Sequence, residues 1–218
     1  MTSDYTLDVE LEQLRLGVGD PPIALTRPIS TVWRDGEYTA IAGPSGCGKT
    51  TLLLSIAGLA RPISGRVLLN DRPVSTVESH QRGISMVFQE ESLYPHMKVE
   101  RLLRTGAIDV EGLPGRLEWL VEHLGLASLM NRRPGQLSGG QRRRVAVAKC
   151  LASGKPIRLL DEPLRALDDD SMVMTRDCLR RFHDENRGIT IHVTHDVTAA
   201  KLADRTIDFS QWTCDDAI

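Results

Sequence analysis

The sequence predicts an α/β protein with a mostly parallel central sheet, an N-terminal antiparallel β subdomain and a helical subdomain inserted at about residues 93–152. Two observations predict this class. After Pro156, short apolar strand-like runs alternate with helical stretches, the pattern of β-α-β crossovers that give parallel strands. Between residues 94 and 152, by contrast, the pattern is helical only. We expect residues 1–218 to form a single domain, because no repeat or linker interrupts them.

The strands are predicted from period-two alternation and from short apolar runs. Tyr5, Leu7, Val9 and Leu11 alternate with polar residues, which is typical of a half-buried strand. Further strands are expected, in chain order, at residues 14–18, 29–34, 37–43, 64–74, 84–88, 157–160, 189–194 and 205–209.

The helices are predicted from apolar residues at helical spacing. One helix is expected from Lys49 to near Gly58. A second follows the stripe of Leu117, Leu120, Val121 and Leu124, spaced i, i+3, i+4 and i+7. A third begins near residue 139 and carries Val145, Ala148, Leu151 and Ala152 on one face.

Composition excludes several classes of protein. A formal charge of −2 gives no whole-chain electrostatic reason to expect nucleic acid. The four cysteines include no CxxC pair, so reduced thiols are expected rather than disulfides or a zinc site. The acidic, alternating N-terminus is no signal peptide, and the longest apolar stretch, residues 51–60, is short of the roughly 20 residues of a membrane span. Any action at a membrane is therefore expected to go through a partner.

A phosphate-binding loop is the clearest motif. Residues 43–50 read GPSGCGKT, which fits G-x-x-x-x-G-K-[ST] between an expected strand and an expected helix. Backbone N–H groups of such a loop surround a polyphosphate, the lysine (Lys49) reaches its β- and γ-phosphates, and the hydroxyl of Thr50 binds Mg²⁺. The core is therefore expected to be that of a P-loop NTPase. The expected nucleotide contacts are Gly43, Pro44, Ser45, Gly46, Cys47, Gly48, Lys49, Thr50 and Thr51.

Cys47 has two interpretations. It lies near a helix N-terminus and Lys49, a setting that favours reactive thiolates, so its alkylation is expected to block nucleotide binding. Alternatively, Cys47 is simply a small residue that the loop tolerates.

Two carboxylates follow an apolar run in LLDEP. Asp161 and Glu162 stand where a buried strand is expected to end, the edge at which open α/β sheets bind ligands. Asp161 suits a magnesium ligand, and Glu162 suits the general base for water that attacks a γ-phosphate. Arg158 is unusual in such a strand, and its guanidinium is expected to reach solvent near the strand start.

A second helix start carries two glycines that weaken it. Ser138 and Gln141 fit a capping box, which explains both of them but leaves Gly139 and Gly140 unexplained. Bare backbone at a helix N-terminus lets an anion approach closely, so this segment is predicted to contact phosphate. One chain is not expected to bring both helix starts to one nucleotide, whereas a head-to-tail pair of chains would. The following run, 142–144, consists of three arginines and is expected to be a solvated face.

The ordered set of GPSGCGKT, Gln89 after a strand, LSGGQ (137–141), LLDEP, ALD (166–168) and His195 after a strand resembles the ATP-binding subunit of ABC transporters. The resemblance covers essentially the whole chain, and LSGGQ shortly before LLDEP is its most specific part. LYPHM (93–97) is most similar to importer subunits. The resemblance implies a nucleotide-sandwich dimer that ATP binding closes and hydrolysis reopens.

The resemblance also implies residue roles. Gln89 would sense magnesium and the attacking water, and His195 would contact the γ-phosphate. Ser138, Gly139, Gly140 and Gln141 would contact the γ-phosphate bound by the opposite subunit, and Asp168 would belong to a loop that signals between the two sites. The other histidines considered, His80, His123, His183 and His192, are expected to be structural.

The function expected from the resemblance is hydrolysis of Mg-ATP that powers solute import. The partners would be a second copy or a paralogous ATPase subunit, a membrane permease that docks on residues 90–97 through Leu93 and Tyr94, and indirectly a solute-binding protein. The expected location is the cytoplasmic face of the inner membrane. The alternatives are a subunit for export, lipoprotein release or cell division, a DNA-repair ATPase, which would need long coiled coils that this sequence lacks, and a translation factor.

The sequence departs from the family pattern in four places. The region GVGDPPIALT (17–26) has no aromatic residue for adenine to stack on. Arg165 stands where the family usually has serine, and Lys149-Cys150 replace the usual Arg-Ala. The sequence ends at Ile218, so we expect no regulatory domain. Activity is expected to survive, because none of these departures touches Lys49, Asp161 or Glu162.

Overall fold

A computed structural model of the chain describes residues 7–18, 23–90, 93–107, 112–195 and 200–213. The start of the first expected strand, at Tyr5, lies outside the described residues.

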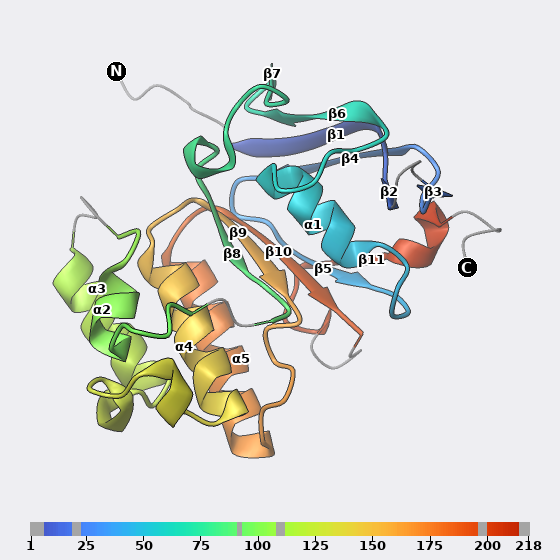
Figure 1. Ribbon diagram of the computed structural model, residues 1–218. Coiled ribbons are helices and arrows are strands. Elements are labelled where there is room, and N and C mark those ends of the chain that lie inside the picture. The colour runs from blue at the N-terminus through green and yellow to red at the C-terminus, as the bar shows by residue number, and fades with distance from the viewer. Residues whose placement is uncertain (1–6, 19–22, 91–92, 108–111, 196–199, 214–218) are drawn as a thin grey trace.

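The centre of the fold is a five-stranded parallel sheet (Figure 1). Its order is β11-β5-β10-β9-β8, and every neighbouring pair is parallel. The strands are β5 (Tyr38–Ala42), β8 (Ile84–Val87), β9 (Ile157–Asp161), β10 (Ile189–Thr194) and β11 (Arg205–Asp208). Every residue of β9 and β10 is buried, including Arg158 in β9 and the Thr and His residues that alternate with apolar ones in β10. The predicted parallel core is confirmed.

A second, antiparallel sheet is built from the N-terminal half of the chain. Its order is β4-β1-β6-β7, formed by β1 (Asp8–Arg15), β4 (Ile29–Arg34), β6 (Ser64–Leu69) and β7 (Arg72–Pro73). Asn70 and Asp71 both have positive φ, the geometry of the tight hairpin turn between β6 and β7. A separate pair, β2 (Gly17–Val18) and β3 (Ile23–Ala24), completes the strands.

The helices lie on both faces of the parallel sheet. They are α1 (Lys49–Ala57), α2 (Val99–Arg104), α3 (Leu113–His123), α4 (Gly139–Ala152) and α5 (Asp169–Glu185). Short 3-10 turns are η1 (Ser79–Gln81), η2 (Ala127–Leu129), η3 (Pro134–Gln136) and η4 (Phe209–Trp212). The predicted stripe on α3 is confirmed, since Leu117, Leu120 and Leu124 are all buried.

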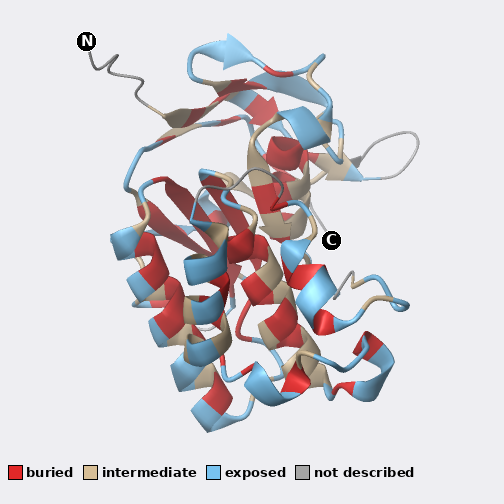
Figure 2. Ribbon diagram, turned by 90° about the vertical axis from the view of Figure 1, so that its left-hand side faces the viewer, coloured by how far each residue is buried: buried red, intermediate tan, exposed pale blue. Residues whose placement is uncertain are grey.

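Two apolar cores flank the parallel sheet. One core joins the antiparallel sheet and α1 to the parallel sheet through Leu11 of β1, Leu53 of α1 and Ile191 of β10. The other lies among α2, α3, α4 and α5, where Leu102 and Val145 pack with Leu160 of β9. Figures 1 and 2 show this layering: α1 between the two sheets, the other helices on the opposite side, and the buried residues concentrated in the parallel strands and on the inward helix faces. The carboxyl ends of the parallel strands are thereby held in fixed register.

Arg158 does not reach solvent, which corrects the expectation from sequence. Its side chain is only 3% exposed, and it donates hydrogen bonds to the carbonyl oxygens of Asn186 (3.0 Å) and Arg187 (3.3 Å). The guanidinium also lies 5.6 Å from the ring centroid of Phe182. The carbonyl groups of the segment between α5 and β10 supply the acceptors that a solvated head would have found in water.

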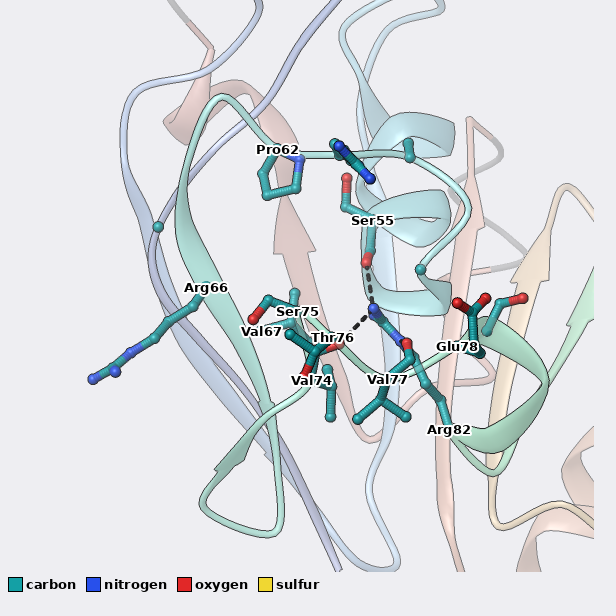
Figure 3. A pocket seen from close by; sticks show the side chains of 15 residues that line it. Ser55, Pro62, Arg66, Val67, Val74, Ser75, Thr76, Val77, Glu78 and Arg82 are labelled. Atoms are coloured by element: carbon teal, nitrogen blue, oxygen red, sulfur yellow. Dashed lines mark hydrogen bonds between the residues drawn. The ribbon is translucent and has the colours of Figure 1, made fainter.

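Arg82 ties the C-terminal end of α1 to the segment that follows β7 (Figure 3). It donates to Ile56 O (2.9 Å) near the C-terminus of α1 and to Val74 O (2.7 Å) and Val77 O (3.1 Å). A positive charge among the last carbonyls of a helix is favourable. A cavity of about 580 Å³ lies beside this arginine, remote from the phosphate loop at the other end of α1.

Candidate active site

The phosphate loop connects the end of β5 to the first turn of α1. Gly48 is the N-cap of α1 and has φ of 108°, a conformation that L side chains rarely adopt. A Cβ there would also lie 3.4 Å from Leu25 Cδ1. Position 48 therefore requires glycine, and the first N–H groups of α1 are left for a ligand.

Lys49 is held inside the loop by backbone oxygens. Its side chain is 6% exposed, and Nζ donates to Gly43 O (2.8 Å) and Pro44 O (2.6 Å). Cys47 Sγ lies 3.7 Å from the same ammonium group. Because Nζ is within the curve of the loop, a polyphosphate bound there would meet a positive charge that is already in position.

Thr50 and Asp161 meet at the end of β9. Thr50 Oγ1 donates to Asp161 Oδ2 (2.8 Å), while the buried Oδ1 of Asp161 has no hydrogen-bond partner among the described residues. Burial, together with the nearby charge of Glu162, raises the pKa of Asp161, although the hydrogen bond from Thr50 opposes this. An unpartnered carboxylate oxygen beside a hydroxyl fits a divalent cation that takes its remaining ligands from phosphate and water. No cluster of three or more His, Cys, Asp or Glu side chains able to bind a metal occurs in the described ranges.

Glu162 and His195 form a pair at the same sheet edge. Glu162 has a φ of 52°, and its N–H donates to Val193 O (3.0 Å) of the neighbouring strand β10. His195, just after β10, places Nδ1 2.7 Å from Glu162 Oε1. A left-handed glutamate is strained, and strain of this kind is concentrated at functional sites.

The phosphate loop, Gln89, Asp161 and Glu162 line one hollow of about 270 Å³. The structure thus brings these predicted residues together. Two residues that the sequence reasoning missed, Val18 and Leu25, also line the hollow, from the β2 and β3 side. In the sequence, the feature that could have indicated this is that both are apolar residues in segment 17–26, which has no aromatic residue.

The LSGGQ segment does not line this hollow, and Figure 1 shows α4 in the lower half of the view and α1 in the upper half. The predicted capping box is confirmed: Ser138 Oγ accepts from Gln141 N (3.2 Å), and Ser138 N donates to Gln141 Oε1 (3.0 Å). A Cβ at Gly139 would meet nothing closer than Arg142 Nη2 at 3.9 Å. Nothing within the described part of the chain therefore requires glycine at position 139.

Arg143 is not part of a solvated face, which corrects the expectation for residues 142–144. It is 1% exposed, and its guanidinium donates to the carbonyl oxygens of Phe88, Asp161 (2.8 Å) and Glu162. These three carbonyl oxygens lie near strand ends, away from water, and need hydrogen-bond donors. The long, forked guanidinium side chain of Arg143 reaches all three of them. Arg143 fixes the backbone on either side of the candidate base.

The remaining predicted residues lie at helix starts and loops. Asp168 is the N-cap of α5, and its carboxylate accepts from Ser171 N (2.9 Å) and Ser171 Oγ (3.0 Å). These hydrogen bonds lower the pKa of Asp168. Residues 91 and 92 of the expected permease surface lie outside the described residues, whereas Tyr94 is 46% exposed.

Comparison with known proteins places this geometry in a family. A profile described as ABC transporter matches residues 26–165. The chain belongs to the ABC transporter family. The sn-glycerol-3-phosphate import ATP-binding protein UgpC 2 of Agrobacterium fabrum is 40% identical over 205 residues, 91% of this chain and 54% of the relative. The maltose/maltodextrin import ATP-binding protein MalK of Yersinia pestis is 42% identical over 188 residues, 84% of this chain and 51% of the relative.

Solved ABC structures share the fold. The post-hydrolysis dimer of the ATP-binding cassette MJ0796, bound to ADP and Pi, has a TM-score of 0.82 and 30% identity, with 92% of this chain and 93% of that chain covered. The chain thus spans about half the length of the curated relatives it matches and nearly all of this ABC cassette. Among the described helices, none combines the length and apolar character that crossing a bilayer demands.

Proposed function

We propose that this chain hydrolyses Mg-ATP and thereby powers solute import through a separate membrane permease. The observation that carries the proposal is that Lys49, Thr50, Asp161 and Glu162 line one hollow at the start of α1. His195 stands beside them, with Nδ1 2.7 Å from Glu162 Oε1. The import relatives named above support the direction of transport.

In this proposal, Lys49 and the N–H groups of the phosphate loop bind the β- and γ-phosphates. Thr50 Oγ1, Asp161 and Gln89 hold magnesium directly or through water, and the metal when bound neutralises charge on the phosphates. Glu162 accepts the proton of the attacking water. His195 orients the Glu162 carboxylate and contacts the γ-phosphate, so that the base is in place before reaction.

Two copies complete each site in this proposal. The LSGGQ segment is absent from the lining of the phosphate hollow, yet Gly139 leaves the first turn of α4 bare. Ser138, Gly139, Gly140 and Gln141 of one copy would therefore contact the γ-phosphate bound to the other, and Asp168 would belong to the loop that signals between the two sites. The dimeric form of the similar cassette supports this arrangement.

Adenine would rest on aliphatic side chains. Val18 is 48% exposed and lines the hollow together with Leu25. Aliphatic contact lacks the stacking energy of an aromatic ring, so weak discrimination between ATP and GTP is expected. A Val18→Tyr variant should then bind ATP more tightly, as measured by equilibrium titration, and unchanged affinity would argue against this position for the base.

The permease would dock beside Tyr94. A groove of about 380 Å³ is lined by apolar Met86, Phe88 and Leu93 and by basic Lys149 and Lys155. The Lys149 ammonium lies 5.0 Å from the Tyr94 ring centroid, which keeps the ring at the groove edge. An amphipathic helix with a carboxylate would fit such a surface. We further propose that residues 1–218 act as one cassette with 93–152 as its helical insertion, at the cytoplasmic face of the cell membrane through this permease.

Phosphate release from Mg-ATP tests the activity. The purified chain should hydrolyse ATP, and Lys49→Ala should reduce the rate at least 100-fold, whereas Lys201→Ala on the exposed surface should not. Equal rates for Lys49→Ala and the unmodified chain would contradict the proposal.

Retention on membranes tests the permease. Expressed in its native host, the chain should co-sediment with membranes, and Tyr94→Ala should release most of it. Val173→Ala, which alters an equally exposed apolar side chain on α5, is the matched control. Equal retention of both variants would contradict the docking surface.

A further inference from the structure

The loop 163–167 connects the two halves of the candidate site within one chain. It begins directly after Glu162, and the Arg165 N–H donates to Glu162 O (3.1 Å). At its other end, Ala166 O lies 3.4 Å from where a Cβ of Gly140 would be. The loop therefore lies between the phosphate hollow and the start of α4.

This placement has a geometric consequence in a symmetric pair, and the inference rests on the dimer proposed above. If the hollow of each copy meets the α4 start of the other, the two-fold axis passes midway between these two places on each chain. Residues that lie midway must then face the second copy close to the axis. Arg165 occupies that position.

Arg165 has no electrostatic partner among the residues that the structure describes. Its side chain is exposed, and no hydrogen bond or ion pair of its guanidinium occurs among the described residues. It borders a hollow of about 210 Å³ together with Glu162 and His195, so it lies on the same face as the candidate base. Two such cations near one axis repel each other unless an anion is present.

We infer that Arg165 of each copy binds the triphosphate held by the phosphate loop of the other copy. A guanidinium can donate two parallel hydrogen bonds to phosphate oxygens, which an ammonium or a serine hydroxyl cannot do. The γ-phosphate supplies the anion that relieves the repulsion between the two arginines. Arg165 thus makes closure of the pair depend on ATP and disfavours closure with ADP or without nucleotide.

Dimer formation in a hydrolysis-deficient background tests this role. With Glu162→Gln alone, Mg-ATP should convert the chain to a dimer by size-exclusion chromatography with light scattering. Adding Arg165→Ala should raise the protein concentration for half-maximal dimer formation at least tenfold, and Arg165→Lys should restore only part of the loss. ATP binding to the monomer, measured with a fluorescent ATP analogue, should not change. If Glu162→Gln itself stays monomeric, the dimer proposal is wrong; if it dimerises and Arg165→Ala dimerises equally, only this inference is wrong.

Mixed pairs separate contact across the pair from contact within one chain. Lys49→Ala in one copy leaves a single nucleotide site, in a partner that carries Glu162→Gln. Arg165→Ala is then added either to the copy with the nucleotide site or to the copy without it. The inference predicts that pairing with Mg-ATP survives when Arg165→Ala is in the copy that holds the nucleotide. It predicts weaker pairing when Arg165→Ala is in the copy without a nucleotide site, because that arginine would contact the triphosphate of its partner. Equal signals from the two mixed pairs, or the reverse order, would overturn it.

Discussion

His195 Nδ1 lies 2.7 Å from Glu162 Oε1, although the two residues are 33 positions apart. The contact exists because β9 and β10 are neighbouring parallel strands, so both residues emerge at the same sheet edge. Glu162 is largely enclosed, while His195 is more than half exposed. An exposed imidazole therefore holds an enclosed carboxylate in one orientation.

Removing the imidazole should impair catalysis more than binding. In His195→Ala, the Glu162 carboxylate loses its orienting partner, and we expect kcat for ATP hydrolysis to fall about 100-fold. The KM for ATP should change far less, because the phosphate loop is untouched. Steady-state phosphate release measures both values, and an unchanged kcat would contradict an orienting role.

Removing Arg143 should destabilise the fold and disturb the site together. Arg143→Ala would leave the carbonyl oxygens of Phe88, Asp161 and Glu162 without this donor. At about 1 kcal/mol or more for each buried acceptor, the free energy of unfolding should fall by about 3 kcal/mol. Urea denaturation measures the loss. Arg132→Ala, at an exposed position, is the control, and equal stability of the two variants would contradict the structural role of Arg143.

The pH dependence of stability should reveal the cost of ionised Asp161. Its pKa is raised in the folded state, chiefly by burial, so the folded chain binds this proton more tightly than the unfolded chain does. The contribution of this proton to the free energy of unfolding is fully present below the pKa of Asp161 in the unfolded chain, about 3.9. It is lost as the pH rises through the pKa of Asp161 in the folded chain. Asp161→Asn should therefore raise the melting temperature of the nucleotide-free protein at pH 7.5, by a margin that shrinks towards pH 4. A lower melting temperature at pH 7.5 would contradict this account.

Cys47 should be the thiol that controls nucleotide binding. Burial raises the pKa of Cys150 to about 11 and of Cys178 to about 12, so neither is expected to react at pH 8. Replacing the fourth cysteine, Cys214, by serine leaves Cys47 as the thiol expected to react. In this Cys214→Ser variant, one equivalent of maleimide should label Cys47 and abolish ATP binding. Mass spectrometry identifies the labelled residue, and Cys47→Ser should keep ATP affinity after the same treatment. Full affinity of the labelled protein would refute the role assigned to the loop.

The sequence predicted β9 and β10 because both are short segments rich in apolar and β-branched residues, which favour strands. It also predicted the capping box, since Ser138 and Gln141 act through contacts three residues apart. It failed for Arg143 and Arg158, which both looked solvated. Their acceptors are carbonyl groups distant in sequence, and no local pattern shows that such groups converge on one guanidinium. Val18 and Leu25 were missed for a similar reason, because only the fold brings them beside the phosphate loop, with which they line one hollow.

The central claim is that two copies share each nucleotide, and the oligomeric state of Glu162→Gln tests it most directly. Light scattering should give the mass of one chain without nucleotide and twice that mass with Mg-ATP, while Glu162→Gln combined with Ser138→Arg should stay monomeric. A Glu162→Gln chain that binds Mg-ATP yet remains a monomer at every protein concentration would contradict the account.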